Sequence, residues 1–359
     1  MSDTKFTYLI GAGASALAMP MINNFASELS DFGKYIESVA IIDDFYHPSL
    51  SIDSKPSEIK EQFIKDVMWL AKECIAHSSV DTFARKLYLS NRLNDLIKLK
   101  ALVSEFLLTK QIQNGIDKRY DAFFAALLDK SDSGLILPNN IKILSWNYDK
   151  QIEYSIAQFY ISSSDNQIDN FLRVFPRANQ TSAPSDAFSL FKLNGVIGGT
   201  ISDNKDYIPM ELDYKLFGEK VTDEHVQNII VNMLYRYYFI ERRISFPSYN
   251  RFNGQREYPT IMYSWEKSPI LDSVRDNALA VTKETEILVI IGYSFPTFNR
   301  ILDKKLLNNM GHLRKVFIQS PKETIEGVAQ RFKSLYEFES DIEIEPIINV
   351  DEFYVPFEY

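Results

Sequence analysis

The sequence has few of the residues that build disulfide or zinc scaffolds. Cys74 is the single cysteine among 359 residues, which excludes intramolecular disulfides and multi-cysteine zinc sites. The four histidines, at positions 47, 77, 225 and 312, form none of the HxH, HExxH or HxxxH spacings of metal sites. We therefore expect no bound metal and a reducing, cytoplasmic location.

Long apolar runs and an excess of basic charge are also lacking. The apolar run at the amino terminus meets glycine after Ile10, and no segment approaches the roughly 20 apolar residues of a membrane helix. Lys and Arg number 39 against 48 Asp and Glu, so the formal charge is −9 and gives no long-range attraction for polyanions. We expect a protein that carries no secretory signal, does not span a membrane and does not bind nucleic acid directly.

Short strand-like runs are present instead. Hydrophobic residues make up 45% and charged residues 24%, the ordinary composition of a globular protein. Apolar runs of this kind occur at 6–10, 141–144, 191–193, 287–291, 315–318 and 342–344. Helical segments separate most of them, which is typical of a parallel sheet covered on both faces.

Helical periodicity fills the region after the first of these strands. Apolar residues recur at helical spacing in three segments, 59–76, 92–110 and 119–130. A polar and aromatic stretch at about 202–257, with a predicted helix at 223–239, interrupts the later strands. We therefore predict one α/β domain over 1–359, a Rossmann-like parallel sheet with a large helical insertion at about 25–130 and a smaller insertion at about 202–257.

The smaller insertion carries an aromatic cluster with more than one interpretation. Its members are Tyr235, Tyr237, Tyr238 and Phe239, followed by two arginines. Aromatics at helical spacing are typical of a core or a subunit interface, whereas a nucleic-acid surface needs a wider basic field. We favour the first interpretation and expect a partner protein or a second protomer to contact this insertion.

The sharpest motif is the glycine turn after the first strand, FTYLI-GAGAS at 6–15. Glycine lets the backbone approach a pyrophosphate, and amides at the start of a following helix bind anions. An ordinary strand-to-helix turn can have the same sequence, so the motif needs support. Three later segments place small or polar residues directly after predicted strands: WNYD at 146–149, LNG at 193–195 and GYSFP at 292–296.

In this order, GAGAS, WNYD, LNG and GYSFP resemble the sirtuin-like family, specifically its bacterial NAD-consuming branch associated with antiphage defence. The resemblance covers about residues 1–20, 78–90, 136–200 and 258–320. It implies that the strand-end turns hold NAD through Gly11, Ala12, Gly13, Ser15, Gly195, Gly292, Ser294 and Gln319. Asn147 and Asp149 match the family's Asn-x-Asp element beside the nicotinamide ribose, and with Asn194 they would form the reacting centre.

The chain departs from the family at two positions. Asn194 stands where the family has the histidine of a Leu-His-Gly motif, and GYSFP continues to Thr297 instead of leading to an aspartate. An amide does not titrate near pH 7, so Asn194 cannot be a general base. Deacetylation depends on such a base, whereas cleavage of NAD releases a neutral nicotinamide and needs less assistance. The lost histidine and the lacking zinc cysteines both argue against a deacetylase.

The leading hypothesis is therefore an NAD hydrolase that releases nicotinamide and ADP-ribose and acts in abortive infection, with NAD as its substrate and no metal. Such an activity would need a resting state and an activator, which could be an operon-encoded sensor, a nucleotide signal or assembly into a homo-oligomer. The alternative is a catalytically silent NAD- or ADP-ribose-binding regulatory subunit of a defence complex. A Rossmann oxidoreductase is disfavoured because Ala16 stands where GxGxxG has its third glycine.

Overall fold

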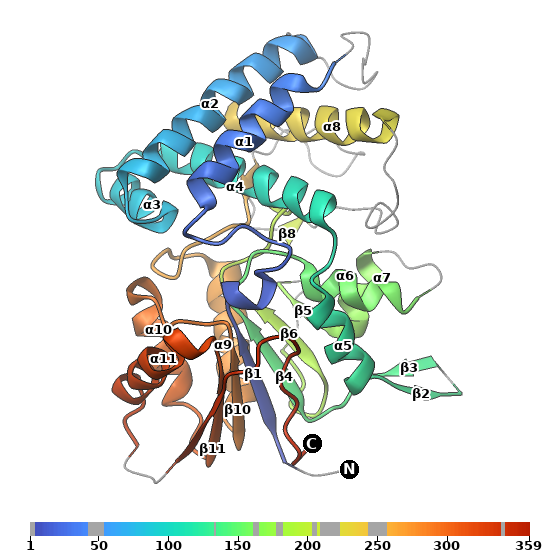
Figure 1. Ribbon diagram of the computed structural model, residues 1–359, viewed down its shortest axis with the longest axis vertical. Coiled ribbons are helices and arrows are strands. Elements are labelled where there is room, and N and C mark those ends of the chain that lie inside the picture. Colours follow the sequence, from blue (N-terminus) through green and yellow to red (C-terminus); the bar gives the residue numbers. More distant parts are fainter. Residues whose placement is uncertain are drawn as a thin grey trace.

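The computed structural model describes residues 4–41, 54–132, 134–160, 165–176, 182–202, 207–208, 223–242, 257–338 and 342–359. Its framework is a seven-stranded sheet in the order β12-β11-β10-β1-β4-β6-β5, and every neighbouring pair is parallel (Figure 1). The strands are β1 (Phe6–Ile10), β4 (Ile141–Ser145), β5 (Val174–Phe175), β6 (Ser189–Lys192), β10 (Ile287–Ile291), β11 (Lys315–Gln319) and β12 (Glu343–Ile347). The predicted Rossmann-like parallel sheet is thus confirmed.

β1 lies in the middle of this sheet and is buried on both faces. Its five residues are all buried and pair in register with β10 and β4, with Phe6 opposite both Ile287 and Ile141. Alternate side chains point to opposite faces, so Tyr8 packs in one hydrophobic cluster and Leu9 in the other. A strand that is covered on both sides needs a continuous apolar sequence, which FTYLI provides.

Different elements cover the two faces of the sheet. One face packs against α9 (Pro269–Thr282), α10 (Arg300–Leu307) and α11 (Lys322–Leu335). The other packs against α5 (Lys118–Leu127), α6 (Gln151–Gln158), α7 (Asp165–Leu172) and the segment after β12. Two contacts between aromatic rings lie on this second face. The ring centroids of Tyr8 and Phe123 are 5.0 Å apart, and those of Phe317 and Tyr354 are 4.7 Å apart.

A layer of helices lies beyond the carboxyl ends of the strands (Figure 1). It comprises α1 (Phe25–Ser38), α2 (Pro56–Ala76), α3 (Val80–Leu89), α4 (Leu93–Asn114) and α8 (Asp223–Arg242). Tyr237 of α8 is 2% exposed and packs against Phe63 of α2, with ring centroids 4.9 Å apart. Tyr235 and Phe239 are buried as well, so these aromatics form core inside this chain; residues 243–256 lie outside the described part.

Smaller elements complete the described structure. β7 (Thr200–Ser202), β8 (Tyr207–Ile208) and β9 (Glu257–Pro259) form an antiparallel sheet, and β2 (Asp129–Ser131) pairs with β3 (Gly134–Ile136). The helix that we predicted at 119–130 ends at Leu127, because the chain turns there into the β2–β3 hairpin. Of the helices described, none combines the length and apolar character needed to cross a membrane.

Candidate functional site

The order in which strands are added to the sheet reverses at β1. From β1 the chain continues to β4 on one side, and after β6 it returns to β10 on the other side. In open parallel sheets, ligands bind outside the carboxyl ends of the strands at such a reversal. The GAGAS turn follows β1 and the GYSFP turn follows β10, so the structure brings both predicted cofactor turns to this point.

These two turns contact each other directly through their backbones. The Gly13 amide donates to the Gly292 carbonyl at 2.9 Å. Gly292 has a φ of +59°, and a Cβ there would lie 2.3 Å from the Ala14 nitrogen. A Cβ on Gly11 would lie 2.7 Å from the Gly292 oxygen. Glycine is therefore required by the packing of the turns themselves, and any contact with a pyrophosphate comes in addition.

Ala12 and Ser15 lie at the two ends of the short helix η1 (Ala12–Ser15) and differ in exposure. Ala12 is exposed, whereas Ser15 is 1% exposed. The Ser15 hydroxyl lies 3.1 Å from the Tyr120 hydroxyl and accepts a hydrogen bond from Asn147 Nδ2 at 3.2 Å. We predicted that Ser15 holds a phosphate, but the structure places its side chain in a buried network under the turn.

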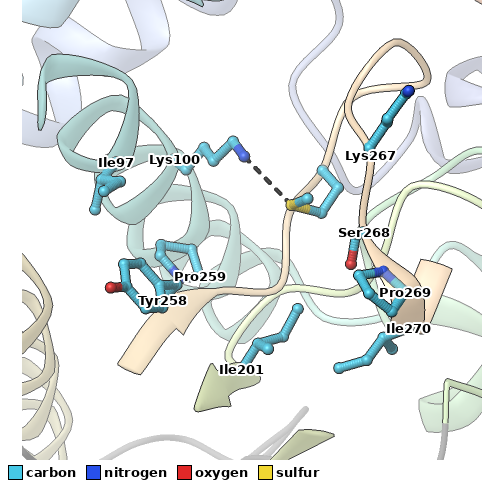
Figure 2. A pocket seen from close by; sticks show the side chains of 10 residues that line it. Ile97, Lys100, Ile201, Tyr258, Pro259, Lys267, Ser268, Pro269 and Ile270 are labelled. Atoms are coloured by element: carbon cyan, nitrogen blue, oxygen red, sulfur yellow. Dashed lines mark hydrogen bonds between the residues drawn. The ribbon is translucent and has the colours of Figure 1, made fainter. Parts of the chain in front are cut away.

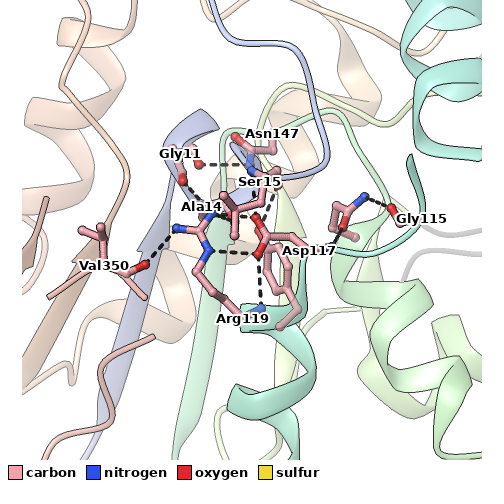
Figure 3. A network of polar contacts seen from close by, with 12 residues as sticks. Gly11, Ala14, Ser15, Gly115, Asp117, Arg119, Asn147 and Val350 are labelled. Atoms are coloured by element: carbon pink, nitrogen blue, oxygen red, sulfur yellow. Dashed lines mark hydrogen bonds and ion pairs between the residues drawn. The ribbon is translucent and has the colours of Figure 1, made fainter. Parts of the chain in front are cut away.

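Asn147 connects the WNYD turn to the glycine turn. Its side chain is almost fully buried, and Nδ2 donates to the Gly11 carbonyl at 3.0 Å as well as to Ser15. The side-chain oxygen accepts no hydrogen bond from the described residues, and it points away from this network (Figure 3). The donor half of the amide therefore holds the scaffold, while the acceptor half is available to a ligand.

Asp149 lies deeper, at the start of α6. Its Oδ1 accepts a hydrogen bond from the Gln151 amide at 3.2 Å. Burial raises the pKa of its carboxyl, although the positive charge of Lys192 acts to lower that pKa. Lys192 Nζ donates to the Asp149 carbonyl at 2.5 Å and pairs with Glu153 at 3.1 Å. Asp149 is thus a buried carboxyl two residues beyond Asn147, and the charge of a buried lysine favours its ionised form.

The LNG turn brings Asn194 next to Tyr148. Asn194 is 6% exposed, its side chain hydrogen-bonds with the Tyr148 hydroxyl, and its Oδ1 accepts no hydrogen bond from the described residues. Gly195 has a φ of +80°, and a Cβ there would lie 1.9 Å from the Thr260 oxygen. The glycine is therefore needed for packing against the 260 segment, and the residue of this turn with unused hydrogen-bonding capacity is Asn194.

Asp81, in the first turn of α3, is the acid that our sequence analysis missed. It lies in the range 78–90, which the sequence analysis included only in the resemblance to the family. The carboxyl is half-buried and has no hydrogen bond or ion pair with the described residues, and burial raises its pKa to about 6. Burial, together with the charge of Asp81, raises the pKa of Tyr148 well above its ordinary value, which places the two side chains near each other. A Ser-capped helix start bearing an acid at its second position was the available signal.

Gln319, which the resemblance predicts to help hold NAD, has its side chain bound to the protein itself. Its Nε2 donates to the carbonyls of Asn349 and Glu352, both at 2.6 Å, and its Oε1 accepts from the Tyr354 amide at 3.1 Å. Both side-chain protons are therefore used to anchor the segment after β12, because that segment runs across the end of β11. Ser294, by contrast, is exposed on the GYSFP turn.

Arg119 is a second residue that the sequence did not reveal. Its guanidinium donates to the carbonyls of Gly13 and Ala14 at 3.1 and 3.2 Å and to that of Val350 at 3.2 Å (Figure 3). It also pairs with Asp117 at 2.6 Å, and the same carboxylate accepts from the Leu17 amide. Arg119 and Asp117 thus hold the second half of the glycine turn and the residues that follow it.

The GYSFP turn rests on a buried acid of its own. Tyr293 Oη donates to Asp303 at 2.7 Å and accepts from Asn299 at 3.0 Å, and burial raises the pKa of Asp303 to about 8. The ring of Tyr293 stacks on Trp146, with centroids 5.8 Å apart. The WNYD and GYSFP turns are therefore in contact with each other.

Comparisons with known proteins give little more. No family model matches the chain, and no curated protein matches it. Among solved structures, a mutant Sir2 homologue in complex with ADP-ribose is similar, with a TM-score of 0.38 and 12% identity over 93% of this chain and 90% of that chain. No functional assignment follows from a likeness of this size. In the described part of the chain, no group of three His, Cys, Asp or Glu side chains could hold a metal ion.

Proposed function

We propose that the chain binds NAD at the carboxyl edge between β1 and β10 and hydrolyses the bond between nicotinamide and ribose. The observation that carries this proposal is the meeting of the turns at the reversal of the sheet. Gly13 contacts Gly292, Asn147 contacts Gly11, and Trp146 stacks on Tyr293. These are the turns on which the sequence resemblance to the sirtuin-like family rests.

Asn147 and Asp149 would act on the ribose. Departure of neutral nicotinamide leaves positive charge on the sugar, and a nearby carboxylate such as Asp149 lowers the energy of that charge. Because Asn147 Nδ2 is held by Gly11 and Ser15, its Oδ1 has a fixed position from which it can accept a hydrogen bond from a ribose hydroxyl or from water.

Asp81 is the group that could replace the family histidine as a base. Water attacks the anomeric carbon, the bond to nicotinamide breaks with its electron pair going to the departing ring, and the proton of the attacking water is released. A carboxyl with a pKa of about 6 is ionised at neutral pH and can take that proton. The uncharged Asn194, next to Tyr148, would orient the attacking water through its unpaired oxygen.

We also propose the biological setting on the strength of the sequence resemblance. NAD hydrolysis in the cytoplasm would deplete the NAD of the host during phage infection. The enzyme would therefore be held inactive until an operon-encoded partner, a nucleotide signal or self-assembly activates it. The alternative of a silent NAD- or ADP-ribose-binding subunit is favoured by one observation, the neutral Asn194 at the place of the histidine.

Nicotinamide release by the purified chain tests the enzyme proposal. The assay is run on the protein alone and together with the products of its neighbouring genes, with ADP-ribose as the second product to be measured. Equal amounts of nicotinamide and ADP-ribose support hydrolysis. No release under any condition contradicts it, and calorimetry that then shows NAD bound intact would favour the regulatory subunit.

A further inference from the structure

A cavity lies between α4, the strands β7 and β9, and the start of α9 (Figure 2). It has a volume of about 250 Å³ and is partly open to solvent. Six mostly apolar side chains form its walls: Ile97, Ile201, Tyr258, Pro259, Met262 and Ile270. A hollow of this kind takes up the apolar part of a small molecule.

One end of the cavity is polar and has unused hydrogen-bonding groups. Ser268 lines it and is 6% exposed, yet its hydroxyl neither caps α9 nor bonds to any other described residue. Pro269 has no N–H, and the first bond within the helix runs from the Asp272 amide to the Ser268 carbonyl at 2.7 Å. The amides of Ile270 and Leu271 are therefore left for a ligand, at the positive end of a 14-residue helix.

The charges around the cavity favour an anion. Lys267 is exposed at its rim, with its side chain directed away from the apolar walls (Figure 2). Lys100, on the wall formed by α4, pairs with Glu266 at 2.5 Å and donates to Met262 Sδ at 3.4 Å, which is the contact drawn in Figure 2. A carboxylate at Ser268 would therefore meet a hydroxyl and free amides, and the acid in the first turn of α9, Asp272, is paired with Arg275 at 3.6 Å.

We infer that this cavity binds a small amphipathic anion, a short aliphatic or aromatic carboxylate whose apolar part lies between the walls and whose carboxylate is bound by Ser268 and the first amides of α9. The occupant would touch Met262, whose amide donates to the Asn194 carbonyl at 2.9 Å. Binding would therefore affect the position of the LNG turn through this hydrogen bond.

Hexanoate, hexanol and hexylamine, tested on the full chain without NAD, examine this inference independently of the hydrolase proposal. Calorimetry should detect hexanoate, with weaker binding of hexanol and none of hexylamine. In ¹⁵N-labelled protein, hexanoate should shift the amides of Ile270 and Leu271. Hexanol binding as tightly as hexanoate, or no binding of hexanoate at millimolar concentration, would overturn the proposed carboxylate site.

Two variants and one control locate the site. Ser268→Ala should weaken hexanoate binding about two- to tenfold, the effect of losing one hydrogen bond. Ile201→Phe should abolish it by filling the cavity, and its melting curve shows whether the fold is kept. Ser334→Ala, on the exposed surface of α11, should leave the affinity unchanged. Binding that is insensitive to both cavity variants would show that hexanoate binds elsewhere, and if Ile201→Phe fails to fold, the amide shifts of the wild-type protein distinguish the same two outcomes.

Discussion

The two sides of the carboxyl edge differ in how their polar groups are used. Around the glycine turn, the side chains of Ser15, Arg119 and Gln319 are bound to other parts of the protein. Around the LNG turn, Asn194 Oδ1 and the Asp81 carboxyl have no hydrogen-bond partner among the described residues. Both sets lie at or near the same edge of the sheet.

This difference separates the residues that stabilise the fold from the residues available for the reaction. A satisfied buried hydrogen bond stabilises the fold by about 1 kcal/mol, whereas a buried polar group without a partner costs free energy unless a ligand or water binds it. Substitutions around the glycine turn should therefore lower stability first. Substitutions at Asp81 or Asn194 should lower turnover first. Asn147 belongs to both sets, because its nitrogen is used by the protein and its oxygen is not.

Arg119→Ala should produce the largest loss of stability. The change leaves Asp117 buried without its cation and removes three bonds to backbone carbonyls, which typically costs about 3–5 kcal/mol. Urea unfolding followed by circular dichroism measures the loss. Arg331→Ala, an exposed arginine on α11, is the control. Equal unfolding curves for the two variants would show that the contacts of Arg119 contribute nothing to stability.

Asp81→Asn should lower turnover by about 100-fold while making the protein more stable at neutral pH. Burial raises the pKa of Asp81 from 3.8 to about 6, so the folded state binds this proton more tightly than the unfolded chain. The resulting stabilisation is complete below about pH 3.8 and is lost as the pH rises through about 6. Above that pH the variant should gain on the order of 2 kcal/mol over the wild type.

The pH dependence of turnover gives a separate readout of Asp81. In the wild type, the rate should rise with pH as the carboxyl ionises near pH 6 and then level off. The Asn variant should lack this rise. A variant that keeps both the rate and the pH profile of the wild type would remove Asp81 from the reaction.

Gln319→Ala should have the next largest effect on stability and almost no effect on the binding of NAD. The change removes the hydrogen bonds to Asn349, Glu352 and Tyr354, which together contribute about 2 kcal/mol to the free energy of unfolding. The segment after β12 should then be cleaved more readily by a protease. KM for NAD should stay within about twofold. If KM rises tenfold while the melting temperature is unchanged, the contact with adenosine implied by the resemblance is right and the anchoring role is minor.

The strands of the parallel sheet other than β5, and the helices α2, α4, α5 and α8, could be predicted because burial constrains the residue types that a segment can contain. A strand covered on both faces must be apolar throughout, so FTYLI at β1 and ILVII at β10 are recognisable in isolation. The end of α5 was missed because the hairpin that replaces its last predicted turn is short and polar. The turns were located correctly because each follows directly on such a strand.

The use of individual side chains could not be predicted in the same way. The Ser15 hydroxyl is taken by Tyr120, 105 residues away, and Gln319 by a segment about 30 residues further on. Asp81 acquires its raised pKa only when the helical layer closes over it. Local sequence shows that a polar residue lies at a strand end, but its partners come from distant parts of the chain.

Asn147→Ala and Ser15→Ala, compared on the same preparations, test the central claim most directly. Asn147→Ala removes the bonds to Gly11 and Ser15, and Ser15→Ala removes those to Tyr120 and Asn147. Each change should therefore lower the free energy of unfolding by about 1–2 kcal/mol and the melting temperature slightly. Only Asn147→Ala also removes the free oxygen, and it should lower nicotinamide release per folded molecule by about 100- to 1,000-fold. Ser15→Ala should retain turnover within a few fold. An Asn147→Ala protein that melts early but releases nicotinamide at the normal rate per folded molecule would contradict the account.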